Sequence, residues 1–107
     1  MYKLDTSNSQ FNQCISSAIA ELRCKNFTPA YEQIVEAMHI YPDAPQPHNL
    51  LGIWFELKGD GVMARRHYRA AYSLDPTFQP ACKNIERICS FENFSSYEFY
   101  FGDEQEK

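Results

Sequence analysis

The chain has 107 residues, of which 44% are apolar, and its formal net charge is −4. This length suits a single domain with a modest hydrophobic core. No apolar run is long enough to cross a bilayer, and the N-terminal residues lack the basic and apolar blocks of a secretory signal. The sequence therefore predicts a cytosolic protein.

The negative charge of the chain is concentrated at its C-terminal end. Residues 1–91 contain nine acidic and nine basic side chains, whereas residues 92–107 contain five acidic side chains and one basic one, Lys107. Nucleic-acid binders present a basic face, and the basic cluster here is expected on the solvated side of one helix. Its members are Lys58, Arg65, Arg66 and Arg69. We therefore expect no nucleic-acid partner and no membrane partner.

The first third of the chain predicts a mobile start followed by a helical hairpin. Residues 1–9 are polar without a periodic pattern, and chain ends of this kind are commonly mobile. Apolar residues then recur at helical spacing over residues 10–24. A second helix begins near Pro29, a residue suited to a first helical turn, and continues to Ile40 before Pro42 stops it.

Residues 45–76 contain a complete unit of two helices and their turn. Prolines at its start suit a helix beginning, where missing N–H groups cost little. Gly59 can close the first helix in a left-handed conformation, and Asp60 can accept hydrogen bonds from the first N–H groups of the next helix. The second helix carries small and aromatic residues on one face at i, i+4 and i+7, namely Ala64, Tyr68 and Ala71.

The two hairpins are related by a shift of 34 residues. The shift places Ala30 on Ala64 and Pro42 on Pro76, so small residues fall on small residues and proline falls on proline. A fixed period of this kind indicates stacked units that each bury a face against the next. The repeat therefore predicts an all-helical stack.

A further shift predicts the first helix of a third unit from Phe78 to about Phe91. Its second helix is doubtful on the pattern alone. Ser95 and Glu98 would form a capping box near its expected start, but Glu98 and Gly102 replace the small and aromatic residues of the other units.

The central unit resembles the tetratricopeptide repeat (TPR). The small, aromatic and proline positions of that repeat are matched by Leu51, Gly52, Phe55, Ala64, Tyr68, Ala71 and Pro76. His48 stands where the family usually has a tryptophan. The resemblance covers roughly residues 11–91. It implies an all-α fold in which antiparallel helix-turn-helix repeats stack as a short right-handed α-solenoid, with about five helices plus an aromatic tail.

The predicted domain organisation follows from this resemblance. Residues 1–9 form a mobile N-terminus, and residues 10–91 form a TPR-like domain. Its repeat units span about residues 11–44 and 45–78, with a partial third unit from residue 79. Residues 92–107 form an aromatic, acidic C-terminal tail.

The resemblance also implies a function, because members of this family bind peptides or proteins in a concave groove lined by the first helix of each unit. They are not themselves catalysts. We therefore expect a protein–protein interaction module, an adaptor or a chaperone-like protein, with a protein or peptide partner. The alternative is a self-assembly module that forms a homodimer or longer array through the end of the stack and the aromatic tail.

Candidate groove residues come from the first helices of the three units. The central helix carries apolar side chains over an arc of about 200°, against about 100° for an ordinary one-sided helix, so it has apolar surface to spare. Leu51, Trp54 and Phe55 are assigned to the core, and the other apolar side chains suit a core or a groove equally well. The complete set of groove candidates is Ile15, Ile19, Asn49, Leu50, Ile53, Leu57, Lys83, Asn84 and Arg87.

These candidates predict the chemistry of the ligand. An apolar groove would take an amphipathic helix or an extended apolar segment. Lys83, Asn84 and Arg87 could hold acidic side chains at one end of it, although an exposed end face of the stack is slightly preferred for them.

The C-terminal tail places six aromatic residues within residues 91–101 and then turns acidic. This composition is too aromatic for an inert disordered end. The rings could cap the open end of the stack, fold back into the groove in place of a partner, or pair with another copy of the chain. Capping is preferred, because terminal repeats require a cap.

The cysteines and histidines predict no catalytic or metal chemistry. Cys14, Cys82 and Cys89 fall at interior positions of their units, where a small buried side chain fits, and they are expected to be reduced. There is no CxxC motif, no ligand spacing between cysteines and histidines, and no phosphate-binding glycine loop. We expect no metal, no cofactor and no enzymatic activity.

Overall fold

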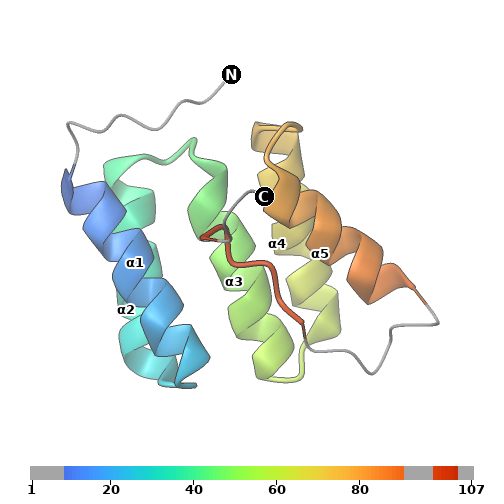
Figure 1. Cartoon of the computed structure of the whole chain (residues 1–107), viewed down its shortest axis with the longest axis horizontal. Coiled ribbons are helices and arrows are strands. Elements are labelled where there is room, and N and C mark those ends of the chain that lie inside the picture. Colours follow the sequence, from blue (N-terminus) through green and yellow to red (C-terminus); the bar gives the residue numbers. More distant parts are fainter. Residues whose placement is uncertain (1–8, 91–97, 104–107) are drawn as a thin grey trace.

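The computed structural model describes residues 9–90 and 98–103, and this part of the chain is all-α, as predicted. Predictions for residues 1–8 and for the capping box at Ser95 lie outside the described residues. The helices are α1 (Ser9–Arg23), α2 (Phe27–Ile40), α3 (Pro45–Leu57), α4 (Gly61–Leu74) and α5 (Gln79–Cys89) (Figure 1).

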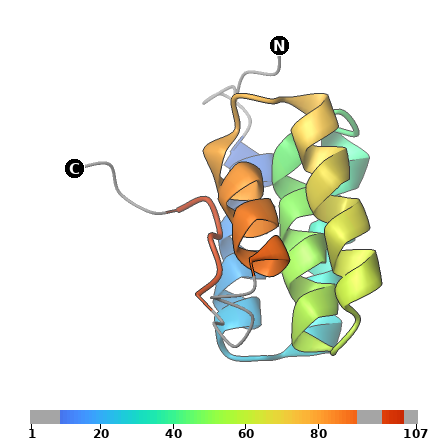
Figure 2. The ribbon, with the colours of Figure 1, turned by 90° about the vertical axis from the view of Figure 1, so that its right-hand side faces the viewer.

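Each helix packs against the next one along the chain, and α1 also contacts α3. Figure 2 shows α1 and α5 on one side of the molecule and α2 and α4 on the other, with α3 between them. Residues 98–103 form no helix or strand, so the second helix of the third unit, doubtful from the sequence, is not present there.

The turn between α3 and α4 has the geometry that its residues predict. Gly59 adopts a φ of +89°, a conformation that costs glycine little. Asp60 then caps α4, because its Oδ1 accepts the N–H of Met63 at 3.1 Å. Pro45 and Pro47 begin α3 and are buried.

The closest contact between α3 and α4 lies at Gly52. A Cβ atom added there would lie 2.5 Å from Cδ1 of Tyr68 and closer still to Cε1, so only glycine leaves room for this ring. Tyr68 is fully buried between Ala64 and Ala71, as predicted. The small residues of the repeat therefore allow the two helices to approach around one aromatic side chain.

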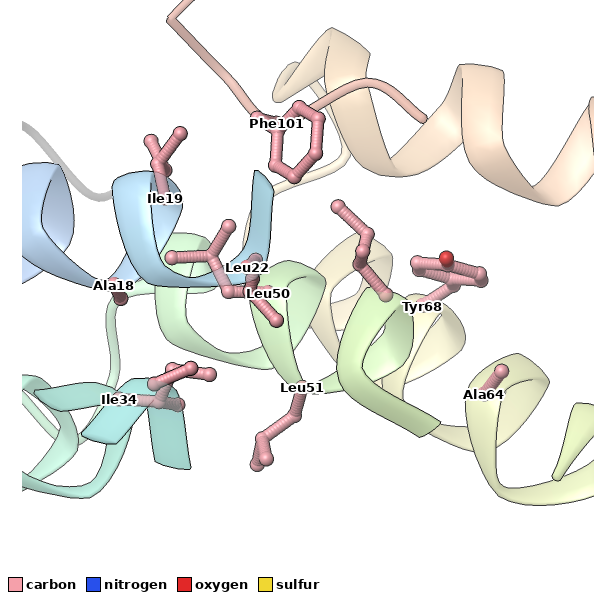
Figure 3. Close-up of a cluster of buried hydrophobic side chains, with 11 residues drawn as sticks. Ala18, Ile19, Leu22, Ile34, Leu50, Leu51, Ala64, Tyr68 and Phe101 are labelled. Atoms are coloured by element: carbon pink, nitrogen blue, oxygen red, sulfur yellow. The ribbon is translucent and has the colours of Figure 1, made fainter. Parts of the chain in front are cut away.

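One main hydrophobic cluster joins α1, α2, α3, α4 and the C-terminal tail. A smaller cluster joins the start of α1 to the end of α2, where the ring of Phe11 meets Tyr41 edge-on at 5.0 Å. Trp54 faces α2 and donates its indole N–H to the carbonyl oxygen of Phe27 at 2.9 Å. Buried members of the main cluster are Ala18, Ile19, Leu22, Ala30, Ile34, Leu50, Leu51, Ile53, Ala64, Tyr68 and Phe101 (Figure 3).

The cysteines follow the predicted pattern only in part. Cys14 is buried, and burial, together with the charge of Glu36, raises the pKa of its thiol. Cys82 is half-buried. The prediction that Cys89 is buried is wrong: it is exposed, because no second helix of a third unit covers that side of α5 among the described residues.

Candidate functional site

Residues 98–103, here called the tail segment, lie across α1, α3 and α5. Figure 1 shows the segment, in red, passing in front of α3, and Figure 2 shows it on the side away from α2 and α4. The preferred prediction, a cap on the open end of the stack, is therefore wrong for these residues. They lie instead against predicted groove residues, which offer hydrogen-bonding amides and an apolar pocket.

The backbone of Tyr100 is held by two buried asparagines. Asn49 and Asn84 each donate a side-chain N–H to the carbonyl oxygen of Tyr100 at 2.9 Å. The N–H of Tyr100 donates in turn to Oδ1 of Asn84 at 3.1 Å, and Asn84 also donates to Oδ1 of Asn49 at 2.8 Å. Both asparagines are fully buried. Burying an amide side chain without hydrogen bonds costs free energy. The backbone of Tyr100 supplies hydrogen-bond partners for both asparagines.

The ring of Phe101 fills the apolar pocket beside this clamp. Only 9% of Phe101 is exposed, and it belongs to the main hydrophobic cluster. Figure 3 shows the ring pointing from the tail segment toward the helices that carry Ile19, Leu22 and Leu50. Burying an aromatic side chain of this size contributes roughly 1.5–3 kcal/mol, so Phe101 is the main apolar anchor of the segment.

Cationic side chains lie along both sides of the tail segment. Arg23 forms a bidentate ion pair with Asp103, with N···O distances of 2.7 and 3.0 Å, and its guanidinium lies 4.5 Å from the ring centre of Phe101. Nζ of Lys83 lies 5.5 Å from the ring of Tyr100. The Arg23–Asp103 pair is about half exposed, so it orients the tail segment more than it stabilises its binding.

Arg87 connects the tail segment to the core. Its guanidinium lies 4.9 Å from the ring of Phe99 and donates to both carboxylate oxygens of Glu56 at 2.7 Å. Arg87 also donates to Oδ1 of Asn84 at 3.3 Å, which fixes that amide for the tail. Burial opposes the charge of Arg87, but the hydrogen bonds and charge of Glu56 raise its pKa overall.

Glu56 is shared between Arg87 and Tyr68. The hydroxyl of Tyr68 donates to Oε1 of Glu56 at 2.7 Å. Burial, then the charge of Glu56 and this hydrogen bond, raise the pKa of Tyr68 far above its ordinary value, so the hydroxyl remains a donor. The repeat core at Tyr68 and the tail-binding amide at Asn84 therefore belong to one hydrogen-bonded network.

A hollow of about 490 Å³ continues from Phe99 along the ends of α1 and α3. It is lined by Lys25, Glu56, Leu57, Gly59 and Phe99. The surface that receives the tail segment, here called the tail-binding surface, consists of Ile19, Leu22, Arg23, Asn49, Leu50, Ile53, Asn84 and Arg87.

Most of the predicted groove residues meet on or beside the tail-binding surface. Leu57 borders the adjoining hollow, and Lys83 is exposed beside Tyr100. Ile15 is partly buried between the two hydrophobic clusters instead. Arg87 is one of the groove candidates, and the slightly preferred alternative, an exposed end face, is wrong for it: Arg87 is 6% exposed and pairs with Glu56.

Three residues of this region are not among the candidates predicted from the sequence, namely Leu22, Arg23 and Glu56. Leu22 follows Ile15 by seven residues and Ile19 by three, so helical spacing could have found it. Glu56 is the only charged residue of α3, and a carboxylate in so apolar a helix indicates a buried partner. No local signal marks Arg23.

A second cluster lies on the other side of α3, where His67 stacks between His48 and Phe55. The two histidine Nδ1 atoms are 3.5 Å apart, and the His67 ring is nearly parallel to Phe55 at 5.3 Å. Within residues 9–90 and 98–103 there is no group of three or more potential metal ligands. The three rings of the cluster stack on one another, and two of them are titratable.

Acid should destabilise the protein through this histidine pair. Burial lowers the pKa of both rings below 6.5, and the charge of His48 lowers that of His67 further. The unfolded chain then binds more protons, so the free energy of unfolding should fall as the pH drops below about 6.5. Urea unfolding at pH 7.5 and 5.0 measures this. His67→Phe should reduce the difference between the two values, and an unchanged difference would contradict the assignment.

None of the helices in the described part of the chain has the length and apolar character needed to span a membrane. No protein-family model, no curated protein and no solved structure matches the chain.

Proposed function

We propose that this chain is a small protein–protein interaction domain of the tetratricopeptide type. It binds an extended segment of a partner polypeptide on the tail-binding surface, which corresponds to the concave face of a short right-handed α-solenoid. The 34-residue period, the Gly52–Tyr68 contact and the antiparallel hairpins support the repeat assignment. The proposed role is that of an adaptor or chaperone-like module without catalysis.

The observation that carries this proposal is the clamp formed by Asn49 and Asn84. It binds both the N–H and the carbonyl oxygen of one residue, Tyr100, which is how a protein holds an extended backbone of variable sequence. The neighbouring pocket adds one aromatic anchor, Phe101. Backbone hydrogen bonds plus a side-chain pocket are the usual combination for peptide recognition.

Peptide binding in trans tests the proposal. The full chain carrying Phe101→Ala, which removes the anchor of its own tail, should bind a labelled, end-blocked peptide of residues 98–103, EFYFGD, with saturable fluorescence anisotropy. Adding Asn84→Ala should weaken binding about tenfold or more, because it leaves polar groups of the complex unpaired. Circular dichroism checks that both variants remain helical. Failure of the folded Phe101→Ala chain to bind at millimolar peptide would contradict the proposal.

The second candidate function is self-assembly through the tail. It is favoured by the same contacts, since the tail segment of one copy would fit the tail-binding surface of another. Light scattering over a range of concentrations separates the two functions. A dimer that dissociates on Phe101→Ala substitution would support self-assembly, and a monomer at every concentration would remove it.

A further inference from the structure

We propose that the tail-binding surface selects partner segments with one pattern: aromatic, any residue, aromatic, glycine, acidic residue. The segment runs in the chain direction of residues 99–103, and the protein's own tail is its resident competitor. This inference rests on the proposed function and names the partner class for the same site. Each position of the pattern follows from a separate contact.

The second aromatic position is set by the pocket at Phe101. The ring is almost fully enclosed by aliphatic side chains of α1 and α3, including Leu22 and Leu50, which are themselves at most 1% exposed. Arg23 lies against the ring at 4.5 Å, a contact that favours an aromatic side chain over an aliphatic one. A small or polar side chain would leave this pocket unfilled.

The glycine position is set by backbone conformation. Gly102 has a φ of +104°, outside the range that other residues adopt without strain. A Cβ there would approach Phe78 only to 3.5 Å, an ordinary contact, so conformation rather than space requires glycine. The bend at Gly102 is followed directly by the ion pair of Asp103 with Arg23.

The acidic position is set by Arg23, whose guanidinium forms bidentate hydrogen bonds to the carboxylate of Asp103.

The first aromatic position is set by Arg87, which lies 4.9 Å from the ring of Phe99. Phe99 also meets Phe101 edge-on at 6.2 Å.

The tail-binding surface recognises the residue between the two aromatic positions through its backbone. Asn49 and Asn84 bond only the N–H and carbonyl oxygen of Tyr100, which every residue except proline offers. The side chain of Tyr100 is half-buried, with the exposed Lys83 beside it. This position should therefore tolerate many residues.

The tail segment is covalently tethered to the surface that it occupies. Seven residues separate Ser90 from Glu98, and a covalent connection of this length gives an effective concentration of about 1 mM. A partner must displace the tail, so its apparent affinity is reduced by the fraction of molecules with an open site. If the free peptide binds with a dissociation constant of about 0.1 mM, the tail lowers apparent affinity about tenfold.

Anisotropy competition on the full chain carrying Phe101→Ala tests the pattern. The probe is the labelled EFYFGD peptide, and the competitors are unlabelled peptides changed at one position. Replacing Phe101 by Ala should weaken the peptide about a hundredfold, and Gly102 by Ala about tenfold. Replacing Tyr100 by Thr should weaken it less than about fivefold. A peptide of reversed sequence should not compete.

A charge exchange tests the acidic position independently. Arg23→Glu in the domain should weaken EFYFGD, and a peptide with Asp103 replaced by Lys should recover the lost affinity. If Phe101→Ala does not fold, Gly102→Val in the full chain serves as the open variant, because it disfavours the bend while leaving the pocket intact.

The outcomes separate the two proposals. No binding of any peptide to a folded open variant contradicts the proposed function itself. Three results would overturn the pattern while the proposed function stands. They are an equal loss of affinity on substitution at positions 100 and 101, equal competition by the reversed peptide, and no recovery of affinity by the charge exchange. Stronger binding of EFYFGD to the open variant than to the unaltered chain supports the tail as competitor, and equal binding overturns that part.

Discussion

Arg87→Met should lower the free energy of unfolding by about 3–5 kcal/mol. The substitution keeps the apolar stem but removes the guanidinium, so the carboxylate of Glu56, only 11% exposed, loses its cationic partner and keeps the hydrogen bond from Tyr68. Removing one member of a buried ion pair has a cost of this size because an uncompensated charge remains inside. Urea unfolding followed by circular dichroism gives the value.

The matched control for this prediction is the double variant Arg87→Met with Glu56→Gln. The amide has no charge to compensate and can still accept from Tyr68, so the double variant should recover at least about 1 kcal/mol relative to Arg87→Met alone. A loss below about 1 kcal/mol for the single variant would show that the pair is effectively solvated.

Gly52→Ala should destabilise the protein by about 1–3 kcal/mol or more, although alanine is the better helix former by about 1 kcal/mol. Tyr68 decides that the net change in stability is a loss. Its ring atoms lie 2.5 Å and less from the added Cβ, and they cannot move away because Tyr68 is buried and hydrogen-bonded to Glu56. Thermal and urea unfolding measure the loss.

Gly61→Ala is the control for Gly52→Ala. Gly61 also lies in a helix, but a Cβ there would meet only Nη1 of Arg65, at 3.8 Å. This variant should be neutral or slightly more stable. If both variants gain stability, the close approach of α3 and α4 is not the constraint that the Gly52 contact implies.

Helix positions could be predicted from the sequence because local residues decide them. Gly59 and Asp60 end one helix and cap the next through contacts within four residues, and Pro45 begins α3 in the same local way. The 34-residue repeat, which relates Ala30 to Ala64, also predicted long-range packing, since equivalent positions of a repeat meet equivalent neighbours. Both alanines are fully buried.

The position of the tail could not be predicted, because it depends on contacts between residues far apart in the chain. Tyr100 is 51 residues from Asn49, and Asp103 is 80 residues from Arg23. No periodic pattern connects such pairs. The two asparagines were identified as groove residues, but the sequence offered nothing to show that the protein's own backbone would satisfy them.

Arg87 shows why residue type alone misassigned one part of the site. A basic residue on a terminal helix is usually solvated, and that reading was preferred. Its partner Glu56 is 31 residues away on an otherwise apolar helix, so the pairing appears only once α3 and α5 are placed side by side.

The hydrogen bonds that join Tyr100 to Asn84, Arg87, Glu56 and Tyr68 have a practical consequence for ligand discovery. A compound or peptide that displaces the tail exchanges one set of stabilising contacts for another, so at a given concentration it should raise the melting temperature of the unaltered chain less than that of a tail-released variant. High-throughput thermal-shift screening against the unaltered chain would therefore miss ligands that a tail-released variant would register.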